Sequence, residues 1–132
     1  MKKILIFLAF IQCNSNADYL ITKNQIGPYI LGSKVEKEYN HKIFDFKFDD
    51  SKNLSSIVVS SKLYKTAEGL GVGSKVSEVL RTYEGSVVSK SNNKNTMLKV
   101  GQINTIATLD GILFVDIDEN DIVDFVSIQK LK

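Results

Sequence analysis

A run of glycines ahead of a short helix is the first place in this sequence where chemistry could occur. The segment Gly69-Leu70-Gly71-Val72-Gly73 leads into Ser74 and Lys75. Free backbone amides at a helix N-terminus bind anions. The spacing, however, matches neither the G-x-G-x-x-G dinucleotide fingerprint nor a phosphate loop, in which the lysine precedes the hydroxyl residue. We therefore interpret the run as a structural turn, and a ligand site beside it is the alternative.

The single histidine, His41, is the next candidate, because histidine is the commonest general base. No Ser-His-Asp or Cys-His arrangement that includes His41 can be argued from the spacing of residues, and one histidine cannot build a multi-histidine zinc site. Its place after an expected helix gives it a structural role as a cation at the helix end. We predict no catalytic residue and no cofactor, and therefore a protein that is not an enzyme.

Three oxygen-bearing residues near the end of the chain have the spacing that opens a calcium loop. They are Asp116, Asp118 and Asn120. The pattern then fails, because Asp121 stands where the loop needs glycine and Ser127 stands where it needs a bidentate glutamate. A polar turn between two apolar strands is the simpler interpretation, and we predict no metal site.

The first seventeen residues have the pattern of a secretory signal peptide. Two lysines precede the apolar run from Ile4 to Ile11, which is far shorter than a membrane span. Ser15-Asn16-Ala17 places small residues where a signal peptidase requires them, so residues 1–17 are expected to be removed. In the alternative, Cys13 accepts a lipid as in a bacterial lipoprotein, although Phe10 and Gln12 differ from a usual lipobox. The protein is expected to be periplasmic or secreted, or anchored in the outer membrane by lipid.

The net charge of the chain argues against two classes of partner, nucleic acid and anionic membrane. After removal of Lys2 and Lys3 with the signal peptide, the chain would have fifteen basic and fifteen acidic residues, and thus a net charge of zero. A balanced, scattered charge argues against nucleic acid and against electrostatic binding to anionic membrane. Contact with a membrane would then occur only through a lipid at Cys13.

The remaining residues, 18–132, read as one domain of short strands joined by turns. Strands are expected at 18–22, 44–48, 54–61, 86–89, 97–100, 103–109, 112–115 and 122–128. Asp110-Gly111 between two apolar runs predicts a hairpin with a type I′ turn. Short connections make the sheet mainly antiparallel, since parallel strands need long crossovers.

Gly-Ser-Lys-Val occurs twice, at 32–35 and at 73–76, and each copy is expected to start a helix. In the first copy, Ser33 and Glu36 have the spacing of a capping box, which predicts a helix from Lys34 to about Tyr39. The second helix follows Gly73 and ends at Gly85. We therefore predict an α+β fold with two short helices on one face of the sheet. An internal duplication of a helix–hairpin unit would have halves at about 25–64 and 65–132.

Aromatic residues supply the candidate contacts. The alternation of Phe44, Phe46 and Phe48 is typical of the inner face of a half-buried strand. Tyrosine is enriched at protein interfaces, and three tyrosines lie next to the glycine turns. The candidate contact residues are Tyr29, Tyr64, Gly69, Gly71 and Tyr83.

The segment Lys65–Ser74, followed by Val76, Val79 and Tyr83, resembles a motif of small exported bacterial proteins and lipoproteins of unknown function. In that motif a T-x-x-G-[ILV]-x-[VI]-G turn leads into a helix closed by Tyr-Gly, whereas Glu84 is inserted here. More loosely, the chain resembles the α+β repeat of β-lactamase-inhibitory proteins and small outer-membrane-assembly lipoproteins. The resemblance implies an envelope location and protein binding.

The expected function is that of an exported, non-enzymatic domain that binds an envelope or extracellular protein. One alternative is a secreted hydrolase inhibitor that uses an open sheet face. The other is a small-ligand carrier that uses the glycine-rich turn.

Overall fold

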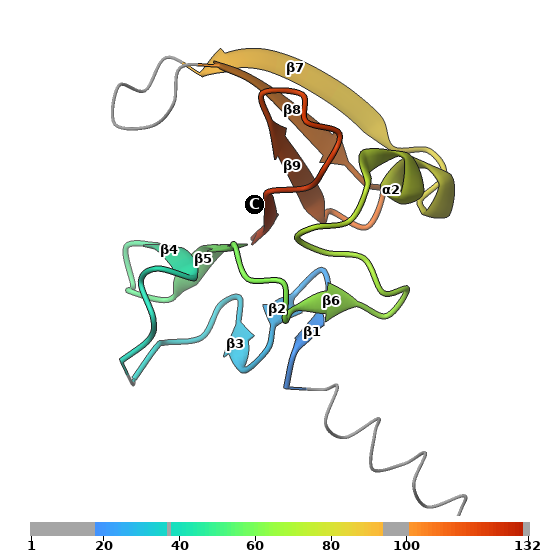
Figure 1. Cartoon of the computed structure of the whole chain (residues 1–132). Helices are drawn as coiled ribbons and strands as arrows, with labels where there is room; N and C mark the ends of the chain where they lie inside the picture. Colours follow the sequence, from blue (N-terminus) through green and yellow to red (C-terminus); the bar gives the residue numbers. More distant parts are fainter. Residues whose placement is uncertain (1–17, 37, 94–100, 131–132) are drawn as a thin grey trace, which may run out of the picture.

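The computed structural model describes residues 18–36, 38–93 and 101–130, which form two sheets and one helix (Figure 1). The helix is α2 (Val76–Thr82). The strands are β1 (Leu20–Ile21), β2 (Gln25–Ile26), β3 (Tyr29–Ile30), β4 (Phe44–Phe48), β5 (Leu54–Val59), β6 (Lys65–Thr66), β7 (Val87–Asn93), β8 (Gly101–Ala107), β9 (Leu113–Ile117) and β10 (Phe125–Gln129). The strand expected at 97–100 lies outside the described residues.

The large sheet has six strands in the order β4-β5-β10-β9-β8-β7, and every neighbouring pair in it is antiparallel. The small sheet has the order β3-β2-β1-β6, and its β1–β6 pair is parallel. The prediction of mainly antiparallel pairing is confirmed. Short turns between most neighbouring strands explain it, whereas the parallel pair is joined by a long connection that contains β2 to β5.

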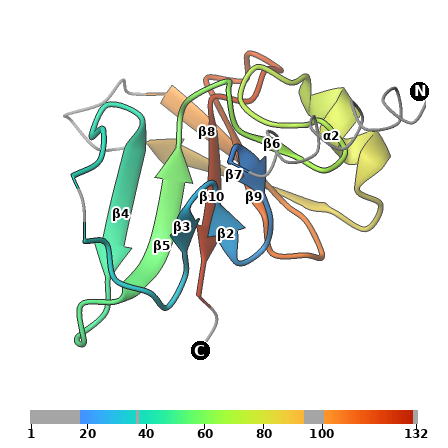
Figure 2. The ribbon, with the colours of Figure 1, turned by 90° about the horizontal axis from the view of Figure 1, so that it is seen from below.

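One face of the large sheet, which we call the inner face, forms the core. A row of five side chains, Phe44, Val59, Val126, Phe114 and Ile106, runs across it, one from each of five adjacent strands. All five are buried. The small sheet and α2 lie over this face (Figure 2).

The cover contributes its own apolar side chains. Ile21 of β1, Ile26 of β2 and Val79 of α2 are among the buried residues of the core. Val79 is the one fully buried side chain of a helix of seven residues, which is too short to be stable in water without such packing.

The prediction of an α+β fold with two short helices on one face of a single sheet is wrong. Residues 34–36 and 38–40 have no helical hydrogen bonds, so the described chain contains one helix and is mostly β-sheet. The backbone of Ser33 is engaged elsewhere, because its carbonyl accepts the Leu54 amide at 2.8 Å. A six-residue helix has little stability of its own, and the half-buried Val35 and Tyr39 pack against the core without one.

The predicted duplication of a helix–hairpin unit is also wrong, because its first helix does not form. The two Gly-Ser pairs do share a local arrangement of backbone hydrogen bonds. Gly32 donates to the carbonyl of Leu54 and Ser33 accepts from its amide, and Gly73 and Ser74 do the same with Val123, at 2.8–2.9 Å. Both glycines have positive φ, of 89° and 92°. The shared sequence therefore encodes a turn that bonds to Leu54 of β5 in the first copy and to Val123, just ahead of β10, in the second.

The second helix begins one residue later than a serine cap would place it. Lys75 occupies the cap position, and its amide donates to the Glu78 side chain at 3.2 Å. The Ser74 hydroxyl instead accepts the amide of Gly71 at 2.9 Å. Serine at this position therefore stabilises the preceding turn.

The aromatic row is confirmed for two of its three members. Phe44 and Phe46 are buried, whereas Phe48 is 45% exposed. The pairing register between β4 and β5 shifts between Lys47 and Phe48. This β-bulge changes the direction of the last side chain relative to the sheet.

The hairpin at Asp110-Gly111 forms, but its turn type differs from the prediction. Only Gly111 has positive φ, of 89°, whereas a type I′ turn requires it at both central residues. Gly111 donates to Thr108, and Thr108 donates to Ile112. The loop is therefore a three-residue connection ending in a left-handed glycine, which satisfies the same strand twist.

The dependence of α2 on one side chain can be tested. Val79→Ala should lower the free energy of unfolding by about 1–3 kcal/mol, because it leaves a cavity under the helix. Leu80→Ala, on the exposed side of the same helix, should change it by less than about 0.5 kcal/mol. Urea denaturation followed by circular dichroism measures both, and equal effects would contradict the packing of α2 through Val79.

Candidate binding surface

The glycine run contacts its own chain. A Cβ atom at Gly71 would lie 2.4 Å from the carbonyl oxygen of Tyr64, so a side chain cannot be accommodated there. Gly71 also forms a β-bridge with Lys65. Gly69 differs, because it is exposed with φ of 86° and a Cβ atom added there would meet no atom within 4 Å. The close approach of the backbone at Gly71 therefore serves the fold.

Tyr83 joins the end of α2 to the glycine turn. Its hydroxyl lies 2.7 Å from both Oε1 of Glu68 and Oγ1 of Thr66, and it donates its hydrogen to the carboxylate. The ring packs on Phe114 at a centroid distance of 5.6 Å. Burial, together with the bond to Glu68, raises the pKa of Tyr83 to about 12. The bond donated by Tyr83 lowers the pKa of Glu68 below its usual value. These shifts keep the tyrosine neutral and the glutamate charged, which suits a structural link.

The other two candidate tyrosines belong to a cluster of aromatic rings. Tyr29 packs edge-on against Phe44 and Phe46 at 4.9 Å, and Tyr64 contacts Phe44 at 5.2 Å. Tyr64 is 9% exposed, and burial raises the pKa of its hydroxyl. The five candidate contact residues thus do not form one surface. Gly69, Tyr83 and the buried Gly71 lie around the glycine turn, whereas Tyr29 and Tyr64 belong to the aromatic cluster. Cys13 lies outside the described residues.

The remaining residues singled out in the sequence have local contacts. His41 is exposed and its ring lies 4.2 Å from that of Tyr39. Asp116 is fully buried, and its two oxygens accept the amides of Asn120 and Asp121 at 2.9 Å. Its carboxylate therefore shapes the turn. Among the described residues, no three acidic, histidine or cysteine side chains lie close enough to hold a metal ion.

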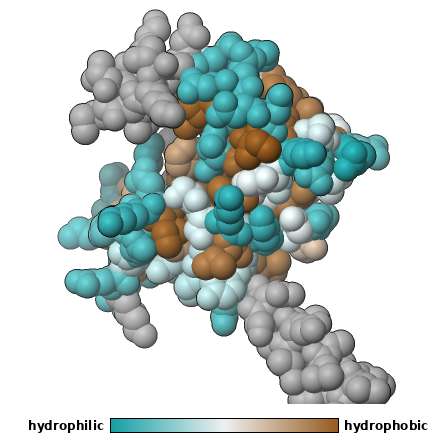
Figure 3. Space-filling view, viewed as in Figure 1, coloured by the Kyte–Doolittle hydropathy of each residue, from teal (hydrophilic) through white to brown (hydrophobic). Residues whose placement is uncertain are grey.

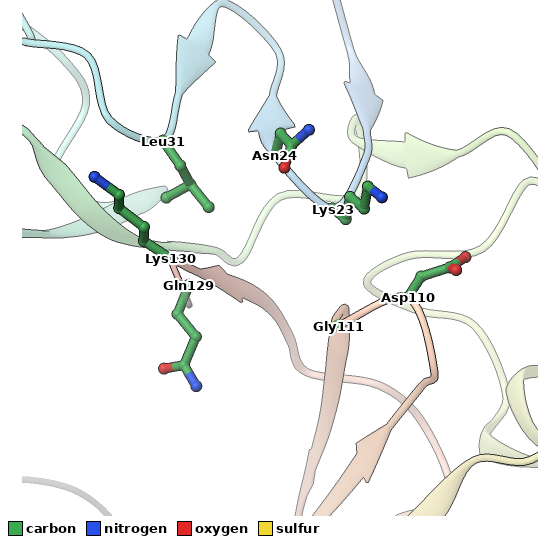
Figure 4. Close-up of a pocket in the computed structure, with 7 residues that line it drawn as sticks. All are labelled: Lys23, Asn24, Leu31, Asp110, Gly111, Gln129 and Lys130. Carbon is green, nitrogen blue, oxygen red and sulfur yellow. The ribbon is translucent and has the colours of Figure 1, made fainter. Parts of the chain in front are cut away.

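A hollow of about 340 Å³ lies between the β1–β2 turn and the hairpin at Asp110. Its lining residues are Lys23, Asn24, Leu31, Asp110, Gly111, Gln129 and Lys130. Figure 4 shows that the polar ends of Gln129, Lys130 and Asp110 point in different directions. Charges of both signs that do not converge give a ligand no defined contact, so we do not treat this hollow as a site.

The face of the large sheet opposite the core, which we call the outer face, is largely apolar in its central strands, whereas β4 presents the exposed Asp45 and Lys47 on it. Strand alternation places on it Val58, Phe125, Leu113, Val115, Ile117, Ile103, Ala107 and Val87, and with them the hydroxyls of Ser127, Thr105 and Ser89. Except for Val87 and Ser89, which are exposed, these residues are half-buried. No described helix or strand covers this face, since α2 and the small sheet both pack on the inner face.

Two hollows meet on the outer face at Phe125 and Ser60. One, of about 370 Å³, is bordered by Ile117 and by the acidic Asp118 and Asp124. The other, of about 130 Å³, reaches Val58 and His41. Together they form a depression with an apolar floor and a negative end. Figure 3 shows apolar and hydrophilic areas interspersed on the side of the molecule that is seen in Figure 1.

These outer-face residues were not singled out from the sequence. A signal was present, because Ile57-Val58-Val59 and Ile112-Leu113-Phe114-Val115 are unbroken apolar runs. Continuous runs indicate strands that are apolar on both faces. The alternating pattern at Phe44–Phe48, in contrast, predicts only one apolar face, which is the covered one.

Comparison with protein-family models, with curated proteins and with solved structures finds no match to this chain. The resemblance to small exported proteins therefore stays a prediction. Among the described residues, no helix is long and apolar enough to cross a bilayer.

The two glycines provide a matched test of the turn. Gly71→Ala should lower the free energy of unfolding by more than about 3 kcal/mol, because its Cβ would collide with backbone. Gly69→Ala should cost only about 1–2 kcal/mol, the penalty of a left-handed conformation in open space. Thermal unfolding of both variants measures the difference, and an equal loss would show that space at Gly71 is not limiting.

The link between Glu68 and Tyr83 predicts a pH dependence. Because folding lowers the pKa of Glu68, its contribution to stability is present above the unfolded-state pKa and is lost as the pH falls through the folded one. Glu68→Gln should therefore destabilise the protein at about pH 7 and have little effect at about pH 2. Urea unfolding at both pH values measures this. Glu84→Gln removes an exposed carboxylate of the same charge and is the matched control.

Proposed function

We propose that this chain is an exported, non-enzymatic domain that binds another protein of the cell envelope through the outer face of its large sheet. The observation that carries the proposal is the open apolar surface around Phe125, which the protein's own described elements leave uncovered. Exposed apolar surface of this kind commonly marks a protein-interaction site on a soluble domain.

The shape of the surface favours a protein over a small molecule. Small-ligand sites enclose most of the ligand, and enclosure needs walls on several sides. The depression at Phe125 is walled by turns at its ends and has no described element above it. A folded partner can cover such a surface, and aromatic side chains at its centre commonly supply much of the binding energy.

Charge adds a preference for one orientation. The connection between β9 and β10 places Asp118 and Asp124 at one end of the depression, whereas His41, Lys42 and Asp45 border the other. A partner with basic side chains near its acidic end would be complementary. The pattern of residues 1–17, which is typical of a signal peptide, supports the envelope as the place of binding.

The proposal predicts that one outer-face substitution abolishes binding. Val115→Lys places a charge at the centre of the outer face and should weaken capture of a specific envelope protein by about 30-fold or more. Leu109→Lys, at the exposed tip of the β8–β9 hairpin, adds the same charge outside the face and should leave capture unchanged. Quantitative affinity capture from envelope extracts, with thermal melting to check folding, measures both.

The identity of the captured protein separates the two protein-binding roles. Recovery of a hydrolase whose activity falls on addition of the purified domain would make the domain an inhibitor. Recovery of no specific protein, or equal loss in both variants, would contradict the proposed function.

A further inference from the structure

The hydrogen-bond pattern of the large sheet identifies which backbone groups of β7 point away from it. Thr108 donates to Ile112, and Asp118 donates to Gln102, so the even-numbered residues of β8 bond to β9. The odd-numbered residues of β8 must then bond to β7, whose register pairs Val87 with Ala107. It follows that the amides and carbonyls of residues 88, 90 and 92 face outward from the edge.

This edge has little of the usual protection against strand pairing. In the described chain, β7 is the outermost strand, has seven residues and shows no shift in register. The opposite edge strand, β4, is shorter and carries the β-bulge at Lys47. Edge strands are commonly protected by bulges, charges or short length. The one charge on β7 is Lys90, and it is paired with Glu119 at 2.9 Å.

The side chains at the start of β7 are unusually exposed for apolar residues. Val87 is 61% exposed on the outer face, and Val88 is 42% exposed on the inner face beyond the cover. An added strand would bury part of both. The edge thus combines unpaired backbone groups with apolar side chains on its two sides.

We infer that β7 accepts an extended segment of the partner protein as a seventh strand of the large sheet. This inference rests on the proposed protein-binding function and specifies how the partner docks. Only another extended backbone can pair with a row of outward amides and carbonyls. The valines at one end favour β-branched or aromatic residues in the added strand. The ammonium group of Lys90 has three N–H donors, and Glu119 accepts from one of them. Lys90 therefore favours an acidic residue in the added strand, two positions from the residue that lies opposite Val88.

A second copy of the chain fits the edge less well than a foreign strand. Antiparallel self-pairing centred on residue 90 places two lysines opposite each other, which is destabilising. Pairing centred on residue 89 places each Val88 opposite a lysine. A separate partner strand can match all these positions, and Val87 and Ser89 make the edge continuous with the outer face.

Hydrogen exchange measured by NMR tests the edge in the unmodified protein. In the free protein, the amides of Val88 and Lys90 should exchange close to the unprotected rate, whereas those of Ser89 and Ser91 should be slow. Slow exchange of Val88 and Lys90 would show that the edge is already covered, and would overturn the inference. A dimer in sedimentation experiments would overturn it in favour of self-pairing.

Peptide binding tests what the edge accepts. A phage library of linear nine-residue peptides, selected on the purified protein, should yield peptides with an apolar residue two positions from an acidic one. Lys90→Pro removes an outward amide while keeping the bonds to β8, so the sheet can tolerate it. It should weaken the selected peptides roughly tenfold or more. Lys90→Ala loses the same charge but keeps the amide, and it should bind much better than the proline variant.

The outcomes distinguish the inference from the function on which it rests. If Val115→Lys abolishes capture of the envelope protein and Lys90→Pro does not, the partner binds the outer face and strand addition is wrong. If neither affects capture, the proposed function fails as well. Absence of any enriched peptide, or equal effects of Lys90→Pro and Lys90→Ala, also overturns strand addition.

Discussion

The structure depends on covering one face of a six-stranded sheet with pieces that are individually too short to be stable. Four strands of two residues each and a helix of seven cannot persist in water alone. They are held because each Gly-Ser turn bonds through two backbone groups to a buried residue, Leu54 in one case and Val123 in the other. Side chains such as Ile21 and Val79 then complete the core. Cover and sheet must therefore form together, which makes their packing cooperative.

The cover is smaller than the apolar surface that the sheet presents. Strands β5, β9 and β10 carry apolar side chains on both faces, yet only the inner one is packed against other described elements. Leaving the outer face open is costly in water, because each buried Å² of apolar area contributes about 25 cal/mol. Such a feature is easier to explain as a site for a partner than as a packing requirement, since no described helix or strand packs over Phe125.

The sequence predicted most strands of the large sheet, because alternation at Phe44–Phe48 and the Asp110-Gly111 signal are local, but it predicted neither β2 nor β3 of the small sheet. It failed at residues 34–39, where helix-forming residues and a capping pattern exist but Ser33 is bonded to Leu54, twenty-one positions away. The identical Gly-Ser-Lys-Val at 73–76 does lead into α2, so tertiary contacts determine whether this sequence starts a helix. An open sheet face was expected, but the residues of the proposed binding surface were missed for a similar reason. Whether an apolar face is covered depends on where distant elements pack, and no local pattern around Phe125 or Val115 contains that information.

The place of β1 in the fold determines how the molecule would be oriented if Cys13 carried a lipid. Tyr19, next to β1, would be joined to the bilayer by six residues, 14–19, which extend to about 20 Å at most. Because β1 belongs to the small sheet, the tether would leave from the covered side of the molecule. The side rich in Phe125 and Val115 would then point away from the lipid, toward proteins across the compartment. A short lipid anchor would thus orient the outer face of the sheet as well as attach the protein to the membrane.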